Sequence, residues 1–257
     1  MKRLFVILLV LLMTVSCCAC GSKETTSGTG STNNTAPTSG TASSGVGNGK
    51  DYMIDNIFFR TYQGTDGEHF QASFRVTNTG NTLLYLTAAF WNLKDSSGKS
   101  ITTSAQQPGT FAYPQVISPG EASWYYINAL TERMTDGSGD IADAEPVYQM
   151  PPRPSEENDY TLFPVSDLRL EESSGNIIAS GSVENNSDRD SYILVYVNLF
   201  DKDGNLVGQL SADSLAIEKG DKKSFTAASD TRKNSGELAL ALSSIARFDA
   251  VAVKVTQ

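Results

Sequence analysis

Short runs of alternating apolar and polar residues, separated by turn-forming pairs, constrain the fold of this chain more than any other feature. Every second residue is apolar in Phe70–Val76, and the same period of two runs through Ile177–Val183. Such alternation is typical of β-strands with one face in a core. Turn signals follow the runs, among them Ser97-Gly98, Pro119-Gly120 and Asp203-Gly204. The pattern predicts an all-β chain of β-sandwiches.

The length of 257 residues fits two domains of ordinary size better than one. Prolines concentrate between Glu145 and Val165, and such a stretch is stiff and is excluded from sheet interiors. We therefore expect a first β-sandwich domain over residues 51–150, a Pro-rich linker over 151–159 and a second β-sandwich domain over 160–257.

The two expected domains share three landmarks in the same order: an asparagine closing a strand, an Asp-x-x-Gly turn, and an Ile-x-x-Gly-acid segment. The asparagine precedes the aspartate by 17 residues in the first half and by 16 in the second. Ordered matches of this kind predict an internal duplication. The landmarks are Asn78, Asp95–Gly98 and Ile117–Glu121, and then Asn185, Asp201–Gly204 and Ile217–Asp221.

Residues 177–225 of the second half resemble the FxLYD family of small all-β domains found in bacterial surface proteins and lipoproteins. The motif falls on Val197-Asn198-Leu199-Phe200-Asp201, with Val in place of Phe and Phe in place of Tyr. The first half reads Trp91-Asn92-Leu93-Lys94-Asp95, with Lys in the Tyr position. The resemblance implies an immunoglobulin-like sandwich, and it implies no activity because the family shares no catalytic site.

The motif also has a structural interpretation. Ile193–Phe200 is apolar on both faces, which predicts a central strand covered on two sides. Asp201 follows it and is expected to accept backbone N–H bonds across the turn ending at Gly204. Near the C-terminus, residues 235–248 fit helical and strand spacing alike, and we expect a short helix there. Val251, Val253 and Val255 then predict an edge or terminal strand.

The N-terminus has the pattern of an export signal. Lys2 and Arg3 precede an apolar run of about a dozen residues, shorter than the ~20 needed to span a bilayer. The following Cys17-Cys18-Ala19-Cys20-Gly21 resembles the lipobox of bacterial lipoproteins, in which a diacylated cysteine becomes the new N-terminus. We expect a signal peptide over residues 1–20 with Cys20 lipidated, and Cys17 is the alternative. An ordinary signal peptide or an uncleaved anchor is the other interpretation.

Residues 21–50 are expected to form a disordered tether, because 20 of these 30 residues are Gly, Ser or Thr. Such a coil reaches about 30 Å. All three cysteines precede it, so the domains would fold without disulfides. The net charge of −9 argues against nucleic acid as a partner.

The chain offers little for catalysis or metal binding. His69 is its single histidine, which argues against a hydrolase triad or a histidine-based zinc site; we expect it exposed in a hairpin turn, and we expect no enzyme activity and no cofactor. Asp201 and Asp203 superficially resemble a calcium loop, but its spacing is wrong, so no metal is predicted. A weak cation site in the acidic stretch is the alternative: Asp136, Asp140, Asp143 and Glu145.

Aromatic residues are the best candidates for binding. Trp124, Tyr125 and Tyr126 are consecutive. Because side chains alternate between the two faces of a strand, at least one of these rings must point outward. Tyr192 and Tyr196 share a face of their strand. Exposed rings could stack on a sugar or contact a protein, unless another sheet covers them. The candidates are Trp124, Tyr126, Tyr192 and Tyr196.

Together these features favour a non-enzymatic lipoprotein on the extracytoplasmic side of the cell membrane, anchored by lipid through its diacylglyceryl cysteine. Its expected role is binding or scaffolding, with an envelope protein or a cell-wall polysaccharide as partner. A carbohydrate-binding module is the first alternative, and a cryptic hydrolase is the second.

Overall fold

A computed structural model describes residues 39–41, 49–103, 107–155, 161–173, 176–228 and 240–254. These residues belong to one compact unit, Ala36–Gln257. The expected signal peptide with Cys17 and Cys20 lies outside the described residues, as do most of the tether and residues 156–159 of the linker. The described part is all-β, apart from two 3₁₀ turns, Thr131–Arg133 and Leu242–Ser244.

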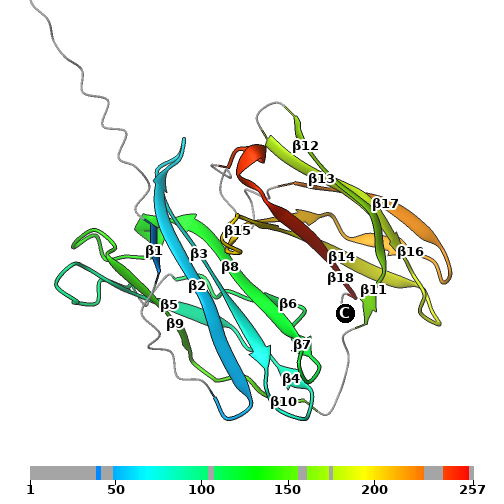
Figure 1. Ribbon diagram of the computed structural model, residues 1–257, viewed down its shortest axis with the longest axis horizontal. Helices are drawn as coiled ribbons and strands as arrows, with labels where there is room; N and C mark the ends of the chain where they lie inside the picture. Colours follow the sequence, from blue (N-terminus) through cyan, green and yellow to red (C-terminus); the bar gives the residue numbers. More distant parts are fainter. Residues whose placement is uncertain are drawn as a thin grey trace, which may run out of the picture. The chain divides into compact units, whose positions relative to one another are not determined.

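The first half is built on a five-stranded antiparallel sheet with the order β1-β2-β3-β8-β6 (Figure 1). Its strands are β1 (Ser39–Thr41), β2 (Tyr52–Gln63), β3 (Glu68–Asn78), β8 (Ala122–Leu130) and β6 (Ala112–Tyr113). β1 belongs to the segment expected to be disordered, and its Gly40 pairs with Phe59. Pairing along a sheet edge uses backbone groups alone, so this part of the tether joins the sheet without apolar side chains.

Smaller sheets face this one across a shared core. They are the pair β5 (Ala89–Lys94) and β9 (Asp143–Tyr148), and the sheet β10 (Arg153–Pro154), β4 (Leu84–Tyr85) and β7 (Val116–Ile117). Phe74 of β3, Tyr125 of β8 and Trp91 of β5 are all fully buried in one cluster. β10 lies in the expected Pro-rich linker and takes an edge position, where the missing N–H of a proline is tolerated.

The second half forms one eight-stranded sheet around its own hydrophobic cluster. The order is β11 (Leu162–Phe163), β18 (Arg247–Lys254), β14 (Ser191–Phe200), β15 (Leu206–Ala212), β17 (Lys222–Ala228), β13 (Asn176–Glu184) and β12 (Val165–Ser173), with β16 (Leu215–Ile217) beside the start of β14. Pro164 alone separates the two end strands in sequence. The sheet therefore curls into a nearly closed, barrel-like form.

Several local expectations are confirmed. β14 is buried over nearly its whole length, as expected for a central strand. Ile177, Ala179 and Val183 of β13 point into the core. Residues 235–239 of the expected short helix lie outside the described residues, and residues 240–248 contain a single 3₁₀ turn, Leu242–Ser244. β18 is the last described strand of the chain, as the terminal alternative had it, and it lies between β11 and β14 and not at the sheet edge.

Asn78 and Asn185 make the same hydrogen bonds in the two halves. Asn78 donates from Nδ2 to the carbonyls of Thr82 and Ile117. Asn185 donates from Nδ2 to the carbonyls of Arg189 and Ile217, at 3.0 and 2.9 Å. The backbone carbonyls of the two asparagines accept from Gly120 and Gly220, respectively. Each asparagine therefore ties the end of one strand to two loops.

The two asparagines come at the ends of β3 and β13, and the strands paired with these two, β2 and β12, are interrupted alike. β2 and β12 each carry a register shift opposite their neighbour, and each shift contains a residue with positive φ, namely Asn56 (48°) and Asp167 (56°). Asn and Asp are the residues that tolerate this conformation best after glycine. The bulges therefore occur at corresponding places in the two sheets.

The Asp-x-x-Gly turns are built as expected. Asp201 accepts from the backbone N–H groups of Asp203 and Asn205 through Oδ1, at 2.9 Å each. Asp95 accepts in the same way from Ser97 and Lys99, at 2.8 and 3.0 Å. These bonds lower the pKa of Asp95, with the Ser97 hydroxyl as the largest cause. The Asp that ends the motif is therefore the residue that holds the turn backbone by hydrogen bonds.

Replacing Asp201 by alanine should destabilise the fold by about 1–2 kcal/mol, because three hydrogen bonds of a half-buried turn are lost. Urea unfolding followed by circular dichroism measures this loss. Asp203→Ala is the matched control, because Asp203 is exposed and pairs with its neighbour Lys202. Equal losses in the two variants would contradict the role given to Asp201.

Candidate binding cleft

Much of the outer face of β3 and β8 is shielded from solvent. Gln71 of β3 is fully buried and donates from Nε2 to the Tyr126 hydroxyl (2.7 Å) and to the Val207 carbonyl in β15 (2.8 Å). Ser73 is fully buried as well. The expectation of a half-buried β3 is therefore wrong, because the second half covers the face that the alternating pattern leaves polar.

Aromatic rings continue this contact between the halves. Tyr113 stacks on Tyr196, with ring centroids 3.9 Å apart. Trp124 meets Phe200 edge to face at 5.2 Å, and the Arg247 guanidinium lies 3.7 Å above the Phe200 ring. The edge-to-face Trp124–Phe200 pair and the Arg247–Phe200 contact add specific attraction to the burial of their area.

A cleft of about 160 Å³ opens beside the Tyr113–Tyr196 stack. Rings form much of its wall, and Phe111 at the rim is 45% exposed. Amide and hydroxyl groups supply the polar part, and no lining residue carries a charge. The main lining residues are Phe111, Tyr113, Tyr126, Asn128, Tyr196 and Gln209.

The polar groups of the cleft are held in place by neighbours outside it. Asn128 donates from Nδ2 to the Tyr62 hydroxyl at 2.8 Å. Gln209 donates from Nε2 to Oδ1 of Asn198 at 3.0 Å. Burial raises the pKa of Tyr126 far above its usual range. Its phenol stays protonated at every physiological pH, so the cleft carries no charge. The hydrogen bonds of Asn128 and Gln209 fix the orientation of its amide groups.

The four aromatic residues predicted to bind have different surroundings. Tyr126 and Tyr196 line the cleft, and Trp124 packs against the second half beside Phe200. Tyr192 is 52% exposed and does not line the cleft. Sequence reasoning missed Phe111, Tyr113, Asn128 and Gln209; the one available signal is an apolar ring at Phe111 directly after the loop-forming Pro108-Gly109-Thr110.

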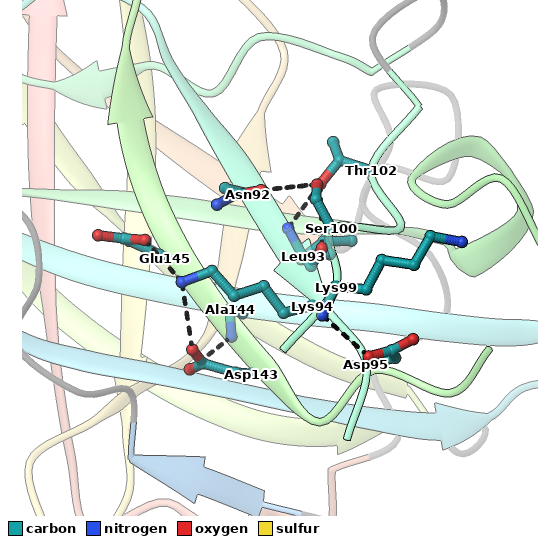
Figure 2. Close-up of polar contacts among 10 residues, drawn as sticks. All are labelled: Asn92, Leu93, Lys94, Asp95, Lys99, Ser100, Thr102, Asp143, Ala144 and Glu145. Carbon is teal, nitrogen blue, oxygen red and sulfur yellow. Dashed lines mark hydrogen bonds and ion pairs between the residues drawn. The ribbon is translucent and has the colours of Figure 1, made fainter. Parts of the chain in front are cut away.

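Three of the acidic candidates, Asp143, Glu145 and Asp201, are engaged in other contacts. Figure 2 shows Lys94 between two carboxylates of β9, with Nζ 3.1 Å from Glu145 and 3.7 Å from Asp143. The hydrogen bond to Glu145 is the largest cause of the raised pKa of Lys94. Asp201 is bonded within its turn. Among the described residues, no group of three His, Cys, Asp or Glu side chains could hold a metal ion.

The expectation of an exposed His69 is wrong. Its side chain is 2% exposed, because it is stacked on Tyr62 at 5.2 Å and covered by the hairpin. Nε2 lies 2.7 Å from Oδ1 of Asp66, and this hydrogen bond is the main cause of the lowered pKa of Asp66. Neither residue of the pair lines the cleft.

Comparisons with protein-family models, with curated proteins and with solved structures find no match to this chain. Within the described residues, no helix is long and apolar enough to cross a membrane.

Proposed function

We propose that this chain is a lipid-anchored, extracytoplasmic binding protein of the bacterial envelope, without enzymatic activity. The observation that carries the binding role is the cleft beside Tyr113 and Tyr196. It combines preoriented amide groups with aromatic walls, as small-molecule sites do. Its lining holds no acid, base or charged nucleophile.

The anchor rests on the N-terminal pattern. The short apolar run ends at Cys17-Cys18-Ala19-Cys20, and a diacylated cysteine would hold the chain at the membrane through lipid insertion. The Gly/Ser/Thr-rich tether would then set the distance between the bilayer and the folded part.

The folded part is proposed to be two tandem immunoglobulin-like domains that arose by duplication, the second of FxLYD type. The equal hydrogen bonds of Asn78 and Asn185, the two bulges at Asn56 and Asp167, and the two aspartate turns support a duplication. Separate hydrophobic clusters in the two halves agree with two domains.

Cys20→Ser should abolish lipid attachment and move the chain from the membrane fraction to the soluble extracytoplasmic fraction. Incorporation of labelled fatty acid and fractionation of cells measure both effects. Cys17→Ser is the matched control and should keep label and location. Retained label in Cys20→Ser, with loss in Cys17→Ser, would assign the anchor to the alternative cysteine.

The binding role is tested with the full chain in detergent micelles. Envelope fractions of the producing cell, separated into protein and polysaccharide, should contain a component that binds saturably. Denatured chain is the control for adhesion. The absence of saturable binding to either fraction would overturn the binding role and leave the anchor untouched.

A further inference from the structure

We propose that the cleft beside Tyr113 and Tyr196 binds one ring of a neutral saccharide, stacked on Phe111. This inference rests on the proposed binding function and specifies its ligand. It draws on three properties of the cleft: an exposed ring at its rim, uncharged polar groups in its wall, and its size.

The ring of Phe111 is 45% exposed, although phenylalanine is usually buried. It lies at the mouth of the cleft, next to Gly109, where a Cβ would come within 3.8 Å of the Phe111 ring. A flat apolar face beside polar groups matches a pyranose, which presents C–H bonds on one face and hydroxyls around its edge. We therefore place the sugar ring against the exposed face of the Phe111 ring, which none of the described contacts of Phe111 covers.

The polar groups suit hydroxyls. Gln209 is an amide, which both donates and accepts hydrogen bonds, and Ser211 adds a hydroxyl to the wall. Asn128 is 1% exposed and bonded to Tyr62 through both Nδ2 and Oδ1, so it shapes the wall and leaves the ligand contacts to Gln209 and Ser211. Gln209 is fixed through Asn198 and Asn128 through Tyr62, so little ordering entropy is lost when a ligand binds.

The absence of charged residues in the cleft lining disfavours ionic ligands. No lining residue is charged, and the raised pKa of Tyr126 keeps its phenol neutral. A carboxylate or phosphate entering here would lose hydration without gaining an ion pair. The chain as a whole carries a net charge of −9, which further disfavours anionic polymers.

The volume limits the occupant to one ring. About 160 Å³ lies below the ~300–1,000 Å³ of sites for drug-sized ligands. A single sugar unit of a longer chain fits this space, with the neighbouring units outside. An extended peptide would need a longer groove or a free strand edge.

The test uses the full chain in detergent, titrated by calorimetry with neutral tetrasaccharides of glucose and of N-acetylglucosamine. A tetragalacturonate and a proline-rich decapeptide serve as the charged and peptide probes. At least one neutral tetrasaccharide should bind saturably, and Phe111→Ala should weaken it by about tenfold or more. Gln209→Glu, which places a charge in the wall, should weaken it as well.

Tyr192→Ala is the matched control, because Tyr192 is similarly exposed but lies outside the cleft; its dissociation constant should not change. Thermal unfolding checks that Phe111→Ala remains folded, as expected for a ring at the rim. Failure of all neutral saccharides to bind, equal affinity in Phe111→Ala, or preference for the peptide would overturn the inference. Saturable binding of an envelope protein, together with such a failure, would leave the proposed function standing with a different ligand.

Discussion

Asn185→Ala should lower the free energy of unfolding by about 2–4 kcal/mol. Its side chain is fully buried and its Nδ2 donates to the carbonyls of Arg189 and Ile217. Alanine would leave the buried Ile217 carbonyl without this donor and would open a small cavity. An unsatisfied buried polar group alone costs about 1–3 kcal/mol. Urea unfolding monitored by circular dichroism measures the change.

Asn186→Ala is the matched control, because the neighbouring Asn186 is exposed; its effect should stay within about 0.5 kcal/mol. Asn185→Asp should destabilise at least as strongly as alanine, since a carboxylate would face two carbonyl oxygens. Asn78→Ala should behave like Asn185→Ala, because Asn78 has the equivalent partners. A loss at Asn185 no larger than at Asn186 would refute this account.

The sequence predicted well the features whose physics is local. The Asp201 turn is one example, since its carboxylate binds N–H groups two and four residues away. The inward residues of β13 are another, because strand periodicity alone determines them. The landmark asparagines were recognised by position, although their bonding partners were not.

Features that depend on distant segments were missed or predicted wrongly. Gln71 is buried because it meets Val207, 136 residues away in sequence, and no local pattern encodes that contact. His69 was expected in solvent because Gly67 and Asp66 indicate a turn, yet stacking on Tyr62 buries its ring. The cleft combines residues from both halves of the chain, so neither half could indicate it.

The loss of Trp91 should have the largest effect on stability. Trp91 is fully buried between Phe70 and Phe74, with edge-to-face contacts at 5.7 and 5.6 Å. Trp91→Ala should cost about 3–5 kcal/mol, through lost burial and the remaining cavity. Trp91→Phe is the matched control and should cost less, because it keeps a ring and removes an indole N–H that has no partner among the described residues. Thermal unfolding of both variants measures the difference.

The same variant tests whether the two clusters unfold separately. Trp91 belongs to the hydrophobic cluster of the first half. Val197 of β14, which takes the place of Trp91 in the motif of the second half, belongs to the other cluster. Trp124 is then the single remaining tryptophan, and it reports on β8 of the first half together with its contact with Phe200 of the second. We expect Trp91→Ala to lower the midpoint seen by Trp124 fluorescence, while circular dichroism retains a later transition from the second half. One shared midpoint would mean that the Gln71–Val207 and Tyr113–Tyr196 contacts join the halves into a single cooperative unit.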